Sequence, residues 1–564
     1  MADSLDSRAR EVIRIGDKAF SDKAVVDSLN QEIALNFYPE RANFTSDLTG
    51  GEDFANHLFS SYPVMARREL GNMLAEFLRP DKWFAIHVDD EDLDEGETER
   101  AFLEKLTSIQ WRAMNDPVAN LVTATGQTDH DFAAFGNGVI KYGLNIAGDA
   151  LLFRNYHLRD NAWSENAEGI IDCNHRNWKP TARQLIHHFK DKVSAEVKRA
   201  FEKDPEKTFP CRHVVLPSRL YEYKSKKGKA FPFTSMYVEC ESETVLEETG
   251  LNYFCYVIPR WQTVSGTVFG SSMATSILLP DGRTLQVVMR TLREAGESYV
   301  NPPMIAVSDA IRGDIALYPG GVTTADIEYD ERLGEVLRPI TQDRGGFPIG
   351  EQIAAALKED IRQGFFLDKI QLPEVTRAMT ATEVRRRIQE HIRAAAPISK
   401  PIQKEYNNPL CDGVFQLLRD NGAFPLEEMP GSLEGMELKF KFRSPLDELA
   451  EQNEAELYLD GRDRILFPAA QLDPSLMEIV DLAEGTRDAL RANGWKQKWF
   501  KPKEAIERAR VAQVEEQQAA KIAQQLATAG QVAEQGGKGL DALMNAGAGA
   551  MQPGNGRQRP AQAR

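Results

Sequence analysis

Residues 376–396, TRAMTATEVRRRIQEHIRAAA, contain the clearest helix start in the chain. Thr380 and Glu383 have the S/T-x-x-E spacing of a capping box, in which a hydroxyl and a carboxylate each bind a free amide at a helix N-terminus. One apolar stripe then follows at four-residue spacing: Val384, Ile388 and Ile392. Pro397 cannot continue a helix. The stretch therefore predicts a packed helix that begins at Thr380 and ends before Pro397.

Three arginines follow the cap on this helix. Arg385, Arg386 and Arg387 are consecutive, so they point in three directions around the helix axis and cannot all face one ligand. Glu383 lies three and four residues before the last two, a spacing that favours ion pairs along a helix. We therefore interpret Thr380, Glu383, Arg386 and Arg387 as structural or subunit-interface residues.

The composition is that of a large globular protein. The chain has 564 residues, of which 42% are hydrophobic, enough for about two to four domains with a sizeable core. No apolar run approaches the roughly 20 residues of a membrane span, so we expect no membrane partner. The first residues, MADSLD, lack the basic and apolar regions of a secretory signal. Five scattered cysteines fit free thiols in a reducing cytoplasm.

The chain is acidic, with 68 basic and 85 acidic side chains and a net charge of −17. This charge indicates first a well-solvated surface. It argues against sequence-specific DNA binding, because affinity for DNA comes largely from Lys and Arg on phosphates. It remains compatible with a protein that surrounds DNA without holding it.

Helical and strand-rich stretches alternate, and the predicted fold class is α+β and mainly helical. Apolar periodicity predicts helices over residues 6–36, 53–78, 101–125, 181–201, 282–297, 348–365, 446–493 and 503–527. Short β-rich runs are separated by turn residues: Gly138–Tyr142, Leu151–Tyr156, His213–Leu216, Ser235–Glu239 and Tyr253–Ile258. Another strand is expected over 437–443. The Ala/Gly/Gln-rich residues 528–564 predict a disordered tail.

Two of the predicted helices bracket a small strand-rich excursion. The helices over 282–297 and 348–365 flank residues 304–343, which predict short strands and turns. The second helix carries an apolar stripe at four-residue spacing: Ile353, Leu357, Ile361 and Phe365. This order predicts a helix–excursion–helix unit with one packed face.

Four cations lie on and after this second helix. Lys358 and Arg362 are one helical turn apart, and Lys369 and Arg377 flank the connection to the quoted stretch. In one interpretation they are solvated residues or partners in intersubunit ion pairs. In the alternative they form a small positive set at a constriction through which a polyanion passes.

No catalytic or cofactor motif stands out. The chain has no phosphate-binding loop, no H-E-x-x-H zinc motif and no C-x-x-C pair. Asp90, Asp92 and Asp94 match the first ligands of a calcium loop, but Glu95 and Ala101 stand where that loop needs Gly and Glu. We therefore expect no enzymatic activity, no metal site and no cofactor. The enzyme alternative is a metal-dependent nuclease that uses the carboxylates of residues 89–99.

Beyond these patterns, Met379–Val384 resembles a helix start found in the portal (head-to-tail connector) proteins of short-tailed, podovirus-type bacteriophages. Further stretches resemble this family in the same order: Ala34–Phe44 with Pro39-Glu40-Arg41, Leu78–Phe84, Phe135–Gly138, Arg176 with Thr181 and Arg183–Leu185, Arg260-Trp261, Gly270–Ser272 and Leu279–Asp281. A helix over 473–494 and a Gln/Arg-rich helix over 504–526 are similar too. The ordered set covers about residues 10–525. It departs from the family at Gly270–Met273, where a proline is frequent.

The resemblance implies a ring, usually of twelve subunits, at one vertex of the capsid. Double-stranded DNA would pass through the ring without sequence specificity, during packaging and again during ejection. The implied partners are terminase, tail adaptor proteins, and capsid and scaffolding proteins. The protein would belong to the virion and assemble in the host bacterial cytoplasm. The alternative within structural phage proteins is another head–tail adaptor.

The resemblance also implies a division of the chain into the named parts of a portal subunit. These would be a wing (1–275), a first stem helix (276–297), a clip (298–347), a second stem helix (348–365), a tunnel loop with a wing helix (366–445), a crown (446–527) and the tail (528–564). In this assignment Lys358, Arg362, Lys369 and Arg377 would line the nucleic-acid channel.

Overall fold

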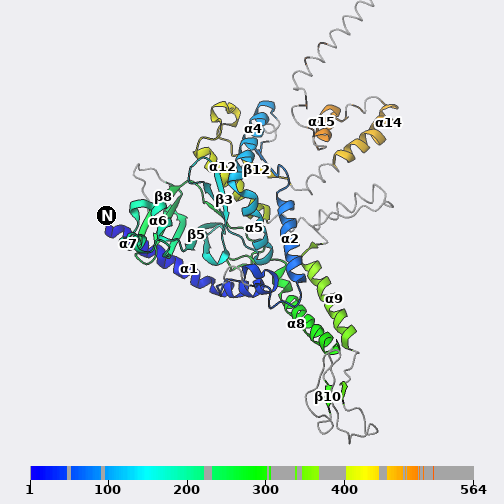
Figure 1. Ribbon diagram of the computed structural model, residues 1–564. Coiled ribbons are helices and arrows are strands. Elements are labelled where there is room, and N and C mark those ends of the chain that lie inside the picture. The colour runs from blue at the N-terminus through cyan, green and yellow to red at the C-terminus, as the bar shows by residue number, and fades with distance from the viewer. Residues whose placement is uncertain are drawn as a thin grey trace, which may run out of the picture. The chain divides into compact units, whose positions relative to one another are not determined.

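The computed structural model describes residues 2–47, 53–90, 96–220, 231–300, 304–306, 337–339, 346–367, 402–443, 454–473, 477, 479–492, 495, 499–500, 508 and 512. The chain forms two units, Met1–Glu454 and Ala455–Arg564 (Figure 1). The described part of the first unit is α+β with a helical majority, as the sequence predicts.

A long N-terminal helix, α1 (Ala2–Phe37), spans the first unit (Figure 1). It confirms the helix predicted over 6–36, and Pro39 begins the next short turn. The helix predicted over 53–78 is shorter: α2 covers Tyr62–Leu78 because Pro63 lies in its first turn, where a missing amide costs nothing. The helix predicted over 101–125 is in fact two.

These two helices are α4 (Glu97–Met114) and α5 (Leu121–Phe135). They are separated at Asn120, whose backbone is left-handed with φ of 57° and which cannot continue a right-handed helix. Ten of the fifteen residues of α5 are buried, so it lies at the centre of the unit. It packs against α2 and the strand β3 (Leu151–Asn155).

A five-stranded antiparallel sheet has the order β4-β5-β6-β7-β8. Its strands are β4 (Asn161–Glu165), β5 (Ile171–Trp178), β6 (Cys211–Pro217), β7 (Phe233–Glu239) and β8 (Thr244–Leu251). Only β6 and β7 contain strands predicted from the sequence. Every residue of β6 is buried, because both faces of the sheet are covered.

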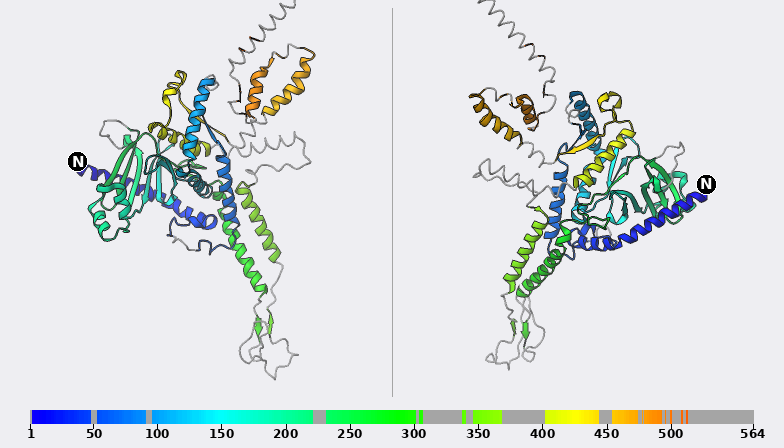
Figure 2. Two further views of the ribbon diagram at one scale, coloured as in Figure 1. Left: turned by 45° about the horizontal axis from the view of Figure 1, so that its top comes forward. Right: turned by 180° about the vertical axis from the view of Figure 1, so that it is seen from behind.

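One face of this sheet packs on α1 through an apolar cluster that contains Val12, Val214 and Met236. The other face is covered by α6 (Ala182–Phe189) and α7 (Ala195–Lys203). A single helix over 181–201 is therefore wrong: the chain turns at Lys190, whose φ is 52°. Figure 2 shows the sheet with α1 crossing it.

A smaller sheet has the order β3-β2-β9, from β2 (Ile140–Leu144), β3 (Leu151–Asn155) and β9 (Tyr256–Val257). Strands β3 and β9 fall within predicted strands, and β2 overlaps the prediction over 138–142 but runs two residues further. A two-stranded sheet joins β1 (Phe84–His87) to β12 (Lys439–Phe442) and confirms the strand predicted over 437–443. The helix α12 (Asn408–Asp420) packs beside it.

The second unit is helical where it is described. A π-helical turn, Arg462–Leu466, leads into α14 (Phe467–Ala470), and α15 covers Leu482–Ala492. Asp481 begins α15 because its carboxylate accepts the amides of Ala483 and Glu484 at 2.9 and 3.1 Å. The described residues thus confirm a helical region within 446–493 and divide it into several helices. Apart from residues 508 and 512, the helix predicted over 503–527 and the tail lie outside the described residues.

Candidate functional site

Two helices and a strand pair form the predicted helix–excursion–helix unit. They are α8 (Thr275–Val300), β10 (Met304–Ala306), β11 (Leu337–Pro339) and α9 (Gly346–Gly364). The strands are antiparallel, with Met304 opposite Pro339. Helix α8 includes Pro280 near its start. Most of residues 298–347 lie outside the described residues.

The two helices run antiparallel and approach closely at two glycines (Figure 1). A Cβ placed on Gly350 would lie 2.7 Å from Leu292 Cδ2, and one on Gly364 would lie 2.6 Å from Leu278 Cδ2. Contacts this short do not occur between real side chains. The leucines of α8 therefore occupy two notches on α9, at Gly350 and Gly364, that exist because glycine has no side chain. The notches set the spacing of the helix pair.

The base of this pair is fixed to the body of the first unit. Phe365, directly after α9, packs its ring edge-on against Phe37 of α1 with centroids 5.6 Å apart. Gln286 of α8 accepts the amides of Phe59 and Ser60 at 2.8 Å each and donates to the carbonyl of Ser60 at 2.9 Å. These contacts tie both helices to segments far away in the sequence.

The start of α8 is fixed by two stretches that the resemblance singled out, Phe135–Gly138 and Gly270–Ser272. Asn137 exchanges two hydrogen bonds with the backbone of Gly270, at 2.7 and 2.9 Å. Gly136 has φ of 69°, and a Cβ there would lie 2.0 Å from the backbone carbon of Ser271. Only glycine fits, so the turn after α5 and the turn before α8 lock together.

Other stretches from the resemblance are structural as well. Arg41 forms a bidentate pair with the buried Asp131, at 3.0 and 2.7 Å, and donates to Asn155 at 2.8 Å. Arg260 binds Glu405 through two nitrogens, at 2.9 and 3.0 Å, and Glu165 through a third contact at 2.7 Å. Such forked pairs hold distant segments in one geometry.

Of the four predicted channel cations, Lys358 and Arg362 lie on α9, one turn apart on the same helix, as their spacing predicts. Lys358 is half-buried, whereas Arg362 is exposed and lies 3.9 Å from a carboxylate oxygen of Glu359. Lys369 and Arg377 lie outside the described residues, as do Thr380, Glu383, Arg386 and Arg387. The role of all eight residues stays a prediction.

The apolar stripe predicted on α9 is partly wrong. Ile361 and Phe365 are fully buried and Leu357 is half-buried, but Ile353 is 46% exposed and the buried position beside it is Ala354. The reason is helix geometry: at 3.6 residues per turn, positions four residues apart drift by about 40° per step, so Ile353 lies well away from the face that Phe365 occupies.

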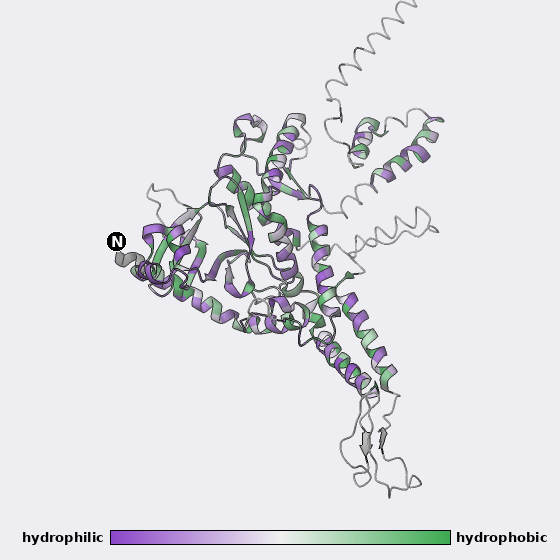
Figure 3. Cartoon of the chain, in the orientation of Figure 1, coloured by the Kyte–Doolittle hydropathy of each residue, from purple (hydrophilic) through white to green (hydrophobic). Residues whose placement is uncertain are grey.

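Large apolar side chains are exposed on the helix pair, and Figure 3 shows hydrophobic and hydrophilic residues interspersed along both helices. They are Ile277, Val287, Tyr299 and Val300 on α8, and Phe347, Ile349 and Ile353 on α9. The sequence predicted a place for only one of them, Ile353, which was expected in the packed stripe of the second helix. Their only sequence signal is that apolar residues occupy more than one face of each helix.

The acidic run over 89–99 does not form a metal site in the described residues. Asp89 pairs with Lys439 of β12, and Glu99 accepts a hydrogen bond from Ser432 at 2.6 Å. Residues 91–95 lie outside the described part. Within that part, no group of three His, Cys, Asp or Glu side chains is placed to hold a metal ion, and no helix has the length and apolarity to cross a membrane.

Comparisons with known proteins support the resemblance. Residues 9–500 match the sequence model of a family described as bacteriophage head to tail connecting protein. The chain is 23% identical over 512 residues to the portal protein of Salmonella phage epsilon15, covering 88% of each chain. It is 25% identical over 418 residues to the probable portal protein of Bordetella phage BPP-1, covering 72% of each chain.

Proposed function

Because the chain belongs to the family of bacteriophage head to tail connecting proteins, we propose that it is the portal subunit at one vertex of the capsid, through which double-stranded DNA is packaged and ejected. The observation that carries the proposal is the collinear match to a portal protein over 88% of both chains. The virion is then its place of action. The family is structural, which favours a channel over an enzyme.

The helix pair supports an assignment of parts. We assign α8 and α9 to the stem. Helix α8 extends beyond the expected bounds 276–297 at both ends, whereas α9 begins before residue 348 and ends just before residue 365. Residues between them, with β10 and β11, form the clip that docks the packaging motor and later the tail. The sheets and helices α1 to α7 form the wing. The tunnel loop and its wing helix lie within residues 366–445. Residues 446–527 form the crown.

Ring closure follows from a head-to-tail contact between subunits. The exposed apolar residues of α8 and α9 supply a surface for a second copy, because complete burial of a fully exposed apolar side chain contributes about 1.5–3 kcal/mol and these partly exposed side chains would each contribute a share of it. A ring of about twelve subunits is the expected form, and the antiparallel stem pairs surround its channel.

The channel must let DNA slide. The helix pair carries both carboxylates and cations, and Arg362 lies beside Glu359. Because carboxylates repel phosphates, the helix pair offers DNA few strong phosphate contacts. Lys358 and Arg362, with Lys369 and Arg377 after them, supply a transient grip that does not depend on base sequence. Terminase, tail adaptor proteins, and capsid and scaffolding proteins are the partners of such a ring.

The test is complementation of a phage whose own copy of this gene is inactive, followed by measurement of nuclease-protected DNA in heads. We expect empty heads without the chain and DNA-filled heads when the full chain is supplied. DNA-filled heads that lack only tails would contradict the portal assignment and indicate the alternative, a head–tail adaptor. Nuclease activity of the purified chain would favour the enzyme alternative.

A further inference from the structure

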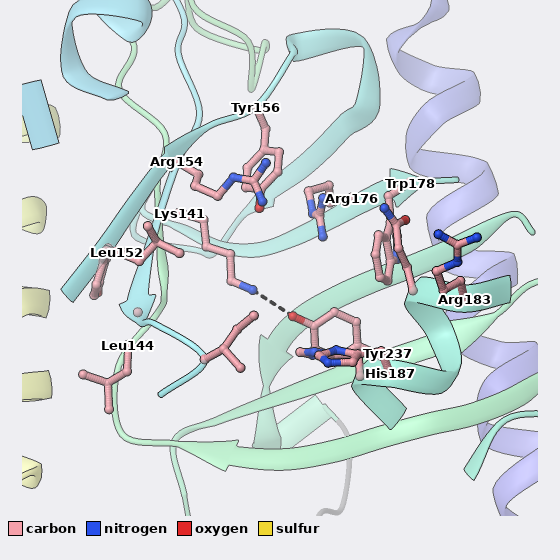
Figure 4. A pocket seen from close by; sticks show the side chains of 15 residues that line it. Lys141, Leu144, Leu152, Arg154, Tyr156, Arg176, Trp178, Arg183, His187 and Tyr237 are labelled. Carbon is pink, nitrogen blue, oxygen red and sulfur yellow. Dashed lines mark hydrogen bonds between the residues drawn. The ribbon is translucent and has the colours of Figure 1, made fainter. Parts of the chain in front are cut away.

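A cavity of about 720 Å³ lies between the small sheet, the five-stranded sheet and α6 (Figure 4). Its volume is in the range of small-molecule sites, roughly 300–1,000 Å³. The lining is basic and aromatic, and no carboxylate is among the described residues that line it. The cations are Lys141, Arg154, Arg176 and Arg183, and the rings include Tyr156, Trp178 and Tyr237.

Two of the cations face each other across a strand pair. Lys141 of β2 is the direct cross-strand partner of Arg154 of β3, an arrangement of like charges that destabilises a sheet. Lys141 donates to the hydroxyl of Tyr237 at 2.8 Å, and the guanidinium of Arg154 lies 5.8 Å from the ring centre of Tyr156. Within the described residues, neither cation has a carboxylate partner. Among the described residues, aromatic rings rather than carboxylates lie beside both cations.

A third cation beside them is buried. Arg176 is 7% exposed and stacks over Tyr156 at 4.2 Å and Trp178 at 5.4 Å. Its Nε and the Nε1 of Trp178 are buried donors without a hydrogen-bond partner among the described residues. An unmet buried donor is costly. Both side chains line the cavity (Figure 4), so two donors that the described residues leave unmet lie within its wall.

We propose that this cavity binds a nucleotide, with the phosphate held by Lys141, Arg154 and Arg176 and the base against the ring of Trp178. Guanidinium groups suit phosphate because they offer paired donors, and aromatic rings stack on any base. Leu144, Ile146 and Leu152 form an apolar wall. The same chemistry occurs in a free nucleotide and in an exposed nucleotide of a single strand. The site is separate from the helix pair, so it does not depend on the channel assignment.

The experiment measures fluorescence anisotropy of a labelled ten-nucleotide oligothymidine with the full-length chain. Arg154→Gln removes an exposed guanidinium, and Trp178→Leu removes the ring. Arg199→Gln, on the exposed surface of α7, is the matched control. We expect about tenfold weaker binding for the first two variants, or about 1.4 kcal/mol, and wild-type binding for the control. Melting temperatures verify that each variant is folded. If Trp178→Leu does not fold, the result for Arg154→Gln alone tests the proposal.

Competition identifies the source of the ligand. Displacement by thymidine monophosphate indicates a free nucleotide, whereas displacement by unlabelled single strand alone indicates an exposed strand; both results support the site. Equal weakening by Arg154→Gln and Arg199→Gln, or equal affinity for duplex DNA, would overturn it. Stronger displacement by an acidic peptide with the sequence of residues 89–99 would overturn it in favour of a peptide site.

Discussion

The rings of Phe37 and Phe365 meet edge-on, 5.6 Å apart and inclined by 60°, and both side chains are fully buried. This contact joins the end of α1 to the end of α9, which are separated by most of the first unit in sequence. It links the base of the proposed stem to the proposed wing. The stem position is therefore set by core packing.

Truncation of this contact tests that link. Phe365→Ala is expected to lower the free energy of unfolding by about 3–5 kcal/mol, the usual cost of a cavity left by a buried phenylalanine. Ile353→Ala removes a half-exposed side chain on the same helix and should cost much less. Urea denaturation followed by tryptophan fluorescence measures both. Equal losses would show that Phe365 is not a packing anchor.

Substitutions at two glycines of the helix pair are expected to change the free energy of unfolding in opposite directions, because only one of the glycines lies at a close helix contact. Gly364→Val places a branched side chain against Leu278 and should destabilise the chain by about 1–3 kcal/mol through overpacking. Gly296→Ala, where no atom lies within 4 Å of the new Cβ, should stabilise α8 by about 0.5–1 kcal/mol. Thermal unfolding checks both signs. A stabilising Gly364→Val would contradict the close approach.

Stability should fall in mild acid because of His157. Burial, followed by the charges of Arg41, Arg159 and Lys23, lowers the pKa of His157 to about 3. Its neutral Nδ1 accepts the amide of Arg159 at 2.9 Å. The unfolded chain binds a proton near pH 6.5 and the folded chain does not, so stability is lost below pH 6.5 by up to about 1.4 kcal/mol per pH unit.

The matched variant is His157→Asn, which keeps an acceptor at the start of this turn but cannot titrate. Unfolding free energies from pH 7 to 4.5 should decline less steeply for the variant than for the wild type. Identical pH profiles would mean that His157 carries its proton in the folded state.

The exposed apolar residues of α9 should be needed for ring closure. Ile349→Asp with Ile353→Asp places two charges where the second copy would pack, and burial of unpaired charge opposes association. Sedimentation should show a loss of rings in favour of smaller species. Val118→Asp, at a residue 57% exposed on the body, is the control and should leave rings intact. Rings in the double variant would place the subunit contact elsewhere.

Neutralisation of Lys358, Arg362, Lys369 and Arg377 to Gln should lower the yield of DNA-filled heads by about tenfold, because a passing polyanion loses its phosphate contacts. Rings should assemble as before. A control variant removes four exposed cations of the body: Arg68, Arg112, Lys198 and Arg199. Normal packaging by the first variant would reject the channel role of these residues.

The sequence predicted the elements whose apolar pattern is regular, such as α1, α9, β6 and β7. It missed β5 because this strand is rich in buried polar groups. Asn174 donates to Asn161 of the neighbouring strand β4, and His175 lies 3.6 Å from the sulfur of Cys173 in the same strand, so polar contacts replace the usual apolar alternation. The break at Lys190 was missed because a lysine rarely adopts positive φ.

The candidate site was predictable only in part. The spacing of Lys358 and Arg362 defines a common side of α9 from the sequence alone. The exposure of Ile353 was missed because a stripe with four-residue spacing drifts around the helix, so its first position leaves the packed face. The basic cavity was missed because its walls come from strands and a helix that meet only in the folded chain.

The most direct test of the portal assignment is a cryo-electron microscopy reconstruction of the purified full-length chain. We predict closed rings, of about twelve subunits, in which the α8–α9 pairs surround a central channel and the exposed apolar residues contact the neighbouring subunit. Monomers or compact dimers at assembly concentrations, or rings whose α8–α9 pairs point away from the channel, would contradict the account.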